Sequence, residues 1–181
     1  MFALLALAGC RADVRVTLDA GAEGHGHVRV AVTLDKPAVA AIGDLRARLR
    51  TDDLAAAGWR VDIARPSADG SVTVAATHAF GDPSEVRLLL QDVGGPGGPL
   101  RDVRLAQRRS FFTTRTTLRG TVDLTAGLAA FTDAALTGAL GGQPLGLTDE
   151  QLRKALGGPA DRAFGLKVAA RLPGAVESNA P

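Results

Sequence analysis

Stretches in which apolar and polar residues alternate recur along this chain, and they constrain its fold more than any other feature. Residues 11–19 place three aliphatic side chains on one face and charged or hydroxyl side chains on the other. Residues 27–34 repeat the pattern with four aliphatic side chains. This period is typical of half-buried strands. The glycine-rich stretch between the two segments predicts that they pair as an antiparallel hairpin.

The rest of the chain alternates between this period and helical spacing. Short connections between neighbouring strands predict one mainly antiparallel sheet. Runs of strands mixed with segregated helices indicate an α+β fold. Further strands are expected near 59–63, 72–80, 101–109, 111–124 and 163–172, and helices near 37–49, 52–58, 84–93, 126–140 and 148–156.

Length and charge limit the classes of function. A chain of 181 residues is one domain of ordinary size. Its net charge of +2 and its 4% aromatic content, without any Tyr, argue against a nucleic-acid partner, which needs a strong basic field or stacking rings. A single Cys excludes an intrachain disulfide framework.

The first ten residues are uncharged and end in that Cys. Leu7-Ala8-Gly9-Cys10 fits the bacterial lipoprotein box, which predicts lipidation of Cys10 and anchoring on the extracytoplasmic face of the cell membrane. The alternative is a buried Cys in a first strand. Nine residues without a basic one precede Cys10, fewer than a signal peptide uses, so we expect either an upstream start or a shortened segment.

No nucleotide-binding loop or nucleophile elbow occurs, so no enzymatic activity and no cofactor are expected. His25 and His27 favour an exposed hairpin end over weak metal binding, because a structural site needs more ligands. His78 shares strand parity with Val74 and Phe80. It is expected either as a satisfied core or rim histidine or as a polar group orienting a ligand headgroup in a pocket.

Inward-facing apolar residues supply candidates for the lining of an apolar cavity: Val74, His78, Phe80, Phe112, Leu118, Phe131 and Phe164. Arginines cluster between positions 101 and 119, and Arg115 and Arg119 lie on the polar face of one expected strand. These two are either part of a solvated face or a surface for anionic lipid headgroups.

Four features occur in order along the chain: the lipoprotein box, Gly58-Trp59-Arg60-Val61, Phe111-Phe112 through Thr121-Val122-Asp123-Leu124, and Leu172-Pro173-Gly174 with Ser178-Asn179. In these features the chain resembles the LppM-domain family of actinobacterial lipoproteins. The resemblance implies a Bet v 1-like α+β domain, in which a curved, mainly antiparallel sheet with helices packed on one face encloses an apolar cavity. It also implies a lipid- or glycolipid-binding role in the cell envelope, without catalytic residues to carry over.

From these features we expect a signal-peptide remnant over 1–9, a single domain over 10–173, and an irregular tail over 174–181. The tail is either the end of a short member or a cut linker to a C-terminal transmembrane helix. The expected function is a membrane-anchored lipoprotein that binds a phospholipid or glycolipid. The alternative is a tethered interaction module whose envelope protein partner is unknown.

Overall fold

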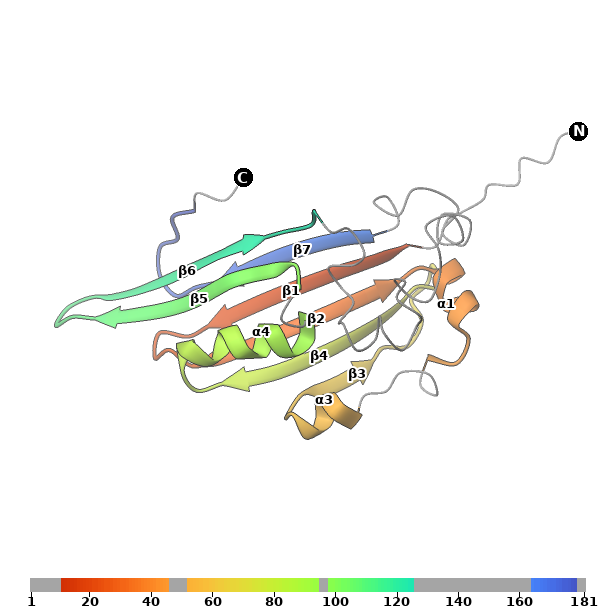
Figure 1. Cartoon of the computed structure of the whole chain (residues 1–181), viewed down its shortest axis with the longest axis horizontal. Coiled ribbons are helices and arrows are strands. Elements are labelled where there is room, and N and C mark those ends of the chain that lie inside the picture. Colours follow the sequence, from red (N-terminus) through yellow and green to blue (C-terminus); the bar gives the residue numbers. More distant parts are fainter. Residues whose placement is uncertain (1–10, 46–51, 95–97, 126–163, 179–181) are drawn as a thin grey trace, which may run out of the picture.

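The computed structural model describes residues 11–45, 52–94, 98–125 and 164–178 (Figure 1). These residues form an α+β fold with two open sheets and few helices. The strands are β1 (Ala12–Ala20), β2 (Gly26–Leu34), β3 (Arg60–Ile63), β4 (Val72–Phe80), β5 (Leu100–Arg109), β6 (Thr114–Val122) and β7 (Phe164–Arg171). The helices are α1 (Lys36–Ile42), α3 (Asp52–Ala56) and α4 (Val86–Gly94), the last preceded by a 3-10 turn at Pro83–Glu85.

Five strands form the larger sheet, in the order β3-β4-β2-β1-β7. The expected hairpin of β1 and β2 is confirmed, with Val16 opposite Val30. The pairs β2–β4 and β3–β4 are also antiparallel. In contrast, β7 lies parallel to β1, with Val14 opposite Leu166. The alternation of apolar and polar residues predicts both strands. It does not predict whether two strands so distant in sequence pair in parallel or antiparallel.

The strands β5 and β6 do not join this sheet. They pair with each other as a separate antiparallel hairpin, so the expectation of one continuous sheet is wrong. The hairpin packs through one face: Leu105 belongs to the buried core, and Leu118 opposite it packs against that core. It therefore covers the larger sheet instead of extending it, and its outward face remains free of the five-stranded sheet.

The core lies between the inner face of the larger sheet and a layer made of α4 and β5. Aliphatic positions of β1, β2 and β4 pack there against one face of α4 (Figure 1). Val28 and Val86, one from each layer, are completely buried. The buried cluster consists of Val16, Leu18, Ala20, Val28, Val30, Trp59, Ala76, Phe80, Val86, Leu89, Leu90 and Leu105.

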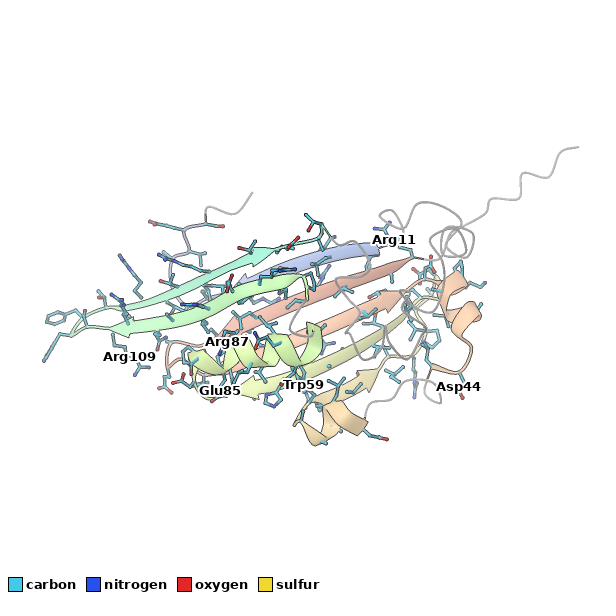
Figure 2. The ribbon with its side chains drawn as sticks, viewed as in Figure 1. Arg11, Asp44, Trp59, Glu85, Arg87 and Arg109 are labelled. Atoms are coloured by element: carbon cyan, nitrogen blue, oxygen red, sulfur yellow. The ribbon has the colours of Figure 1, made fainter. Side chains whose placement is uncertain are left out.

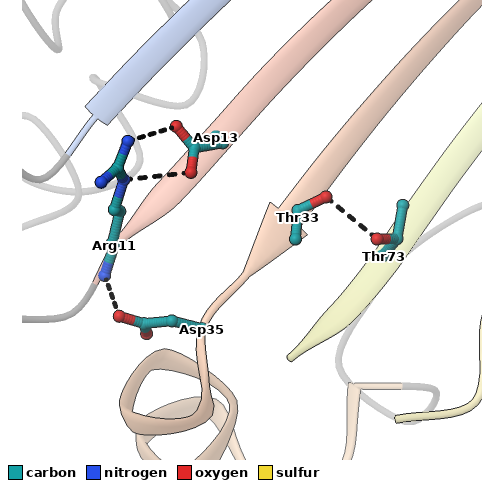
Figure 3. Close-up of polar contacts among 5 residues, drawn as sticks. All are labelled: Arg11, Asp13, Thr33, Asp35 and Thr73. Carbon is teal, nitrogen blue, oxygen red and sulfur yellow. Dashed lines mark hydrogen bonds and ion pairs between the residues drawn. The ribbon is translucent and has the colours of Figure 1, made fainter. Parts of the chain in front are cut away.

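Asp35 links the start of α1 to the start of β1. One carboxylate oxygen caps the helix by accepting a hydrogen bond from the backbone amide of Ala38 at 2.9 Å. The other accepts one from the backbone amide of Arg11, also at 2.9 Å (Figure 3). The Arg11 side chain pairs with Asp13 at 3.0 Å. The N-cap that Asp35 and Pro37 predict is thus confirmed. The same carboxylate also holds Arg11, the residue that precedes β1.

Most expected elements within the described residues are confirmed to within a few positions. The expected helix near 37–49 is not continuous, since α1 ends at Ile42 before Gly43. Positions 46–49 of that expected helix lie outside the described residues. The expected strand over 111–124 begins later, at Thr114, because Phe111 and Phe112 form the hairpin turn. The helices expected over 126–140 and 148–156 lie outside the described residues.

Candidate functional site

One row of aliphatic side chains crosses all five strands of the larger sheet. The cross-strand register aligns, from β3 to β7, Ile63, Val74, Val32, Val14 and Leu166. All five are half-buried. The neighbouring row, nearer the β1–β2 turn, contains buried members of the core. The apolar inner face therefore continues beyond the rows that pack fully beneath α4 and β5.

Val74 and Phe80 both face inward, as their strand parity predicts, but they differ in burial. Phe80 is 3% exposed and is part of the packed core, where it lies over Gly26 of β2. Val74 belongs to the half-buried aliphatic row. Of these two candidates, Val74 is the one with surface left for an apolar ligand.

His78 is tied into the structure by both ring nitrogens. Nε2 lies 3.1 Å from the Ala57 carbonyl oxygen, and Nδ1 lies 2.5 Å from the carbonyl oxygen of Ala79. The centroid of its ring lies 5.3 Å from that of the buried Trp59 indole, and the two ring planes are tilted relative to each other. A side chain on Gly58 would collide with Nε2, and this glycine also has a φ of +86°. This geometry fits a histidine that joins β4 to the α3–β3 turn.

Phe112 is the clear exception among the candidate cavity residues. It is 94% exposed in the turn of the β5–β6 hairpin, so its expected place in a cavity lining is wrong. The alternation that suggested an inward side chain does not extend into the turn. Leu118, in contrast, is half-buried against the core. Phe131 and the Phe164 side chain lie outside the described residues, and the register places Phe164 opposite Ala12.

Four arginines of the hairpin, in two cross-strand pairs, share its outward face. Arg115 lies directly opposite Arg108, and Arg119 lies directly opposite Arg104. All four are exposed, and none forms an ion pair with another residue in the described ranges. Arg101 differs, because it pairs with Asp123 at 3.2 Å. Two cross-strand pairs of like charge thus occupy one surface, where Arg115 and Arg119 alone were candidates.

Phe111 and Phe112 lie in the turn of this hairpin, whereas the sequence pattern places both in a strand over 111–124. Phe111 is 98% exposed, and its ring lies 5.7 Å from that of Phe112. The sequence does contain a signal for them. Ser110 and Thr113 flank the pair, and their backbone and side-chain hydrogen bonds, each 2.8 Å, close the turn. Polar, turn-forming residues around two aromatics mark a tip and not a strand interior.

The perturbed carboxylates of the described residues serve turns. Hydrogen bonds from the Thr125 hydroxyl and amide, with Arg101 nearby, lower the pKa of Asp123. The amide and hydroxyl of Ser71, with the Ser67 hydroxyl, lower the pKa of Asp69. Both carboxylates lie at the surface. The side chains whose hydrogen bonds lower their pKa values are the serine and threonine hydroxyls of the same turns. Their arrangement stabilises loops.

The histidines of the β1–β2 region lie at the surface. His25 is in the turn, where its Nδ1 lies 3.7 Å from Oε2 of Glu23. His27 lies on the outer face of β2, opposite Asp19 on β1 and Ala79 on β4. Throughout the described part of the chain, no three His, Cys, Asp or Glu side chains gather as metal ligands would. Among the helices described, none has the length and hydrophobicity needed to cross a membrane.

Comparison with known proteins gives no relative from which a function can be transferred. The chain matches no protein-family model, and neither the curated proteins nor the solved structures include a significant match. The candidate site therefore consists of two surfaces defined by geometry: the half-buried aliphatic row of the larger sheet and the arginine-bearing face of the hairpin.

Proposed function

We propose that this protein is an envelope lipoprotein, anchored to the extracytoplasmic face of the membrane through Cys10, whose domain binds an acylated lipid or glycolipid on its apolar inner face. The observation that supports lipid binding is the half-buried aliphatic row. Its five branched side chains lie side by side across the sheet, which offers an acyl chain a continuous hydrocarbon surface.

The dimensions of this surface suit an extended acyl chain. Neighbouring strands lie about 4.8 Å apart, so a row across five strands measures roughly 19 Å. Each methylene transferred from water to such a surface contributes about 0.8 kcal/mol. The Bet v 1-like arrangement, in which a curved sheet and helices enclose the ligand, is part of this proposal, and so is membership of the LppM-domain family.

The hairpin arginines provide a second element of the proposal. Arg115 and Arg119 face away from the core together with their cross-strand partners Arg108 and Arg104. Guanidinium groups bind phosphate through paired hydrogen bonds, so this face suits anionic headgroups. The proposal includes no catalytic role, because the described residues that carry perturbed pKa values stabilise turns.

Bound lipid can be measured directly on the full chain. The protein is expressed in a host with a lipid-rich envelope, purified, and examined by native mass spectrometry before and after extraction with organic solvent. We expect a discrete added mass that the solvent removes. A protein that stays free of lipid, even after incubation with envelope lipids, would contradict the proposal and favour the tethered interaction module.

A matched pair of substitutions on β7 locates the ligand. Val168 lies on the inner face opposite Val16 and is 48% exposed, whereas the next residue, Ala169, is exposed on the outer face. Val168→Glu places a carboxylate beside the aliphatic row, and we expect bound lipid to fall roughly tenfold because an unpaired charge against hydrocarbon is costly. Ala169→Glu adds the same charge on the opposite face and should leave bound lipid unchanged.

A further inference from the structure

The tip of the β5–β6 hairpin, residues 108–115, exposes two aromatic rings to solvent. Phe111 and Phe112 are 98% and 94% exposed, more than any other large hydrophobic residue in the described ranges. Figure 1 shows the hairpin extending past the β1–β2 turn, so its tip projects from the body of the domain. Exposed apolar side chains of this size at a projecting position indicate a contact surface, because burial elsewhere in the fold would stabilise the chain.

Positive charge surrounds these rings without compensation. Residues 103–122 contain five arginines and no Asp or Glu. Directly behind the rings, Arg108 faces Arg115 across the hairpin, and four residues further back Arg104 faces Arg119. Like charges directly opposite each other destabilise a hairpin. An anionic surface that binds both strands would remove this repulsion.

The tip is positioned by hydrogen bonds at its base and in its turn. On the inward face, the side chains of Gln107 and Arg109 both donate to the Ala22 carbonyl oxygen, each at 3.1 Å (Figure 2 labels Arg109). Ser110 and Thr113 close the turn. The base of the tip is thereby held against the β1–β2 turn, and the two rings and the outward arginines remain available to a partner.

We propose that this tip inserts into the interface of an anionic lipid bilayer, with Phe111 and Phe112 at the boundary of the acyl chains and Arg108 and Arg115 among the headgroups. The order along the hairpin carries the proposal: apolar rings at the apex, then guanidinium groups. A bilayer presents the complementary order from its hydrocarbon outward. The contact does not depend on lipidation of Cys10 or on a lipid held by the inner face.

Two other partners fit the tip less well. Single-stranded nucleic acid binds where rings and cations line a groove that follows its backbone, whereas these rings lie at an apex. A protein partner would need a pocket to take up the rings. The net charge of +5 over residues 103–122 suits an extended anionic surface better than a single pocket. The experiments below distinguish the nucleic-acid partner from a bilayer directly, and a tip that binds only a protein would leave both kinds of vesicle unbound.

Vesicle sedimentation of the full chain carrying Cys10→Ser tests the tip without an acyl anchor. The vesicles contain phosphatidylcholine alone or a 7:3 mixture with phosphatidylglycerol. We expect binding to the anionic vesicles only. Phe111→Ser with Phe112→Ser should weaken it about tenfold or more, and Arg108→Gln with Arg115→Gln should weaken it about thirtyfold at low salt, given the usual contribution of each Arg near an anionic surface.

Control variants remove similar apolar area and similar charge from surfaces away from the tip. Leu88→Ser removes a side chain that is 54% exposed on α4, and Arg60→Gln with Arg87→Gln removes two exposed charges from β3 and α4. Both should bind anionic vesicles like the parent. Equal binding by the phenylalanine double variant and its parent would overturn insertion. So would preferential binding to a single-stranded oligonucleotide over the anionic vesicles.

Tryptophan fluorescence reports the depth of the tip independently of affinity. The native Trp59 is 3% exposed, so lipid quenchers should not reach it. In Phe111→Trp, we expect a blue shift with anionic vesicles and quenching by brominated acyl chains, whereas Leu88→Trp should show neither. If Phe111→Trp sediments with vesicles but is not quenched, the proposal is overturned, because the tip then adheres to headgroups without inserting.

Discussion

Arg108 and Arg115 lie directly opposite each other across the β5–β6 hairpin, and neither forms an ion pair with any residue in the described ranges. A folded hairpin gains nothing from this arrangement, since cross-strand pairs of like charge are unfavourable. An arrangement that weakens the fold is most readily explained by what it binds. The hairpin therefore has competing requirements for stability and for contact with an anionic surface.

Arg115→Glu separates these two requirements. It converts the repulsive cross-strand pair with Arg108 into an attractive one, so we expect the free energy of unfolding to rise by about 0.5 kcal/mol. Binding to anionic vesicles should fall at the same time. Urea unfolding and vesicle sedimentation measure the two effects. Reduced stability of this variant would show that the pair is not repulsive in solution.

Cys10→Ala tests the anchor. Without a thiol to carry the lipid, we expect the protein to change from a form that resists salt extraction to one that high salt releases from membranes. Residual binding through the hairpin tip depends on charge and is screened by salt. Fractionation of membranes washed at low and high salt measures this change. If the variant resists salt as the parent does, lipidation of Cys10 is not the anchor.

Trp59 contributes volume to the core and not a hydrogen bond. Its indole Nε1 is buried without an acceptor among the described residues. Trp59→Phe removes this unsatisfied donor and keeps most of the apolar volume, so we expect stability to change by less than about 1 kcal/mol. Trp59→Ala leaves a cavity and should cost about 3–5 kcal/mol. Urea unfolding measures the free energy of unfolding of both variants. If Trp59→Phe loses as much stability as Trp59→Ala, the indole N–H has a partner.

Asp35 is expected to matter at two places at once. Asp35→Ala removes the acceptor for the amides of Ala38 and Arg11, and we expect a loss of about 1–2 kcal/mol. Asp35→Asn keeps one acceptor oxygen and should cost less. Asp62→Ala, an exposed position on β3, is the control. Hydrogen exchange of the Ala38 and Arg11 amides should accelerate in Asp35→Ala, and unchanged rates would contradict the link.

Acid should weaken the turn before α4. Hydrogen bonds from the Ser84 hydroxyl and amide lower the pKa of Asp82 below its usual value of 3.8. The ionised carboxylate is the favoured form in the folded chain. Its contribution is therefore complete above pH 3.8 and is lost as the pH falls through the lower pKa of the folded state. The difference in melting temperature between the wild type and Asp82→Ala should shrink as the pH is lowered below 3.8. A difference that stays constant down to the lowest pH at which both proteins fold would contradict this.

Local patterns were sufficient for much of the fold. Alternation defined β1, β2, β4 and β7 to within about two residues, because one face of each strand is apolar. Asp35 with Pro37 predicted the start of α1, since a cap acts on amides three residues away. The inward direction of Val74 and Phe80 followed from the parity of β4. Each of these inferences depends on interactions that are local along the chain.

Pairing between distant segments was beyond these patterns. The parallel contact of β7 with β1 and the separation of the β5–β6 hairpin from the larger sheet depend on tertiary packing. The position of Phe112 was misjudged for a related reason. Whether an aromatic residue between two strand segments continues the strand or forms the turn depends on where the pairing of the two strands ends.

Side-chain period and capping act over a few residues, so local sequence patterns were enough to predict most strands and helices of the described ranges, the apolar strand faces and the concentration of arginines. Three features arise only from packing between distant segments: the aliphatic row aligned across five strands, the position of Arg115 opposite Arg108, and the projection of two phenylalanines from the domain. Cross-strand register and hairpin packing are set by burial of the whole apolar face, which no local window contains.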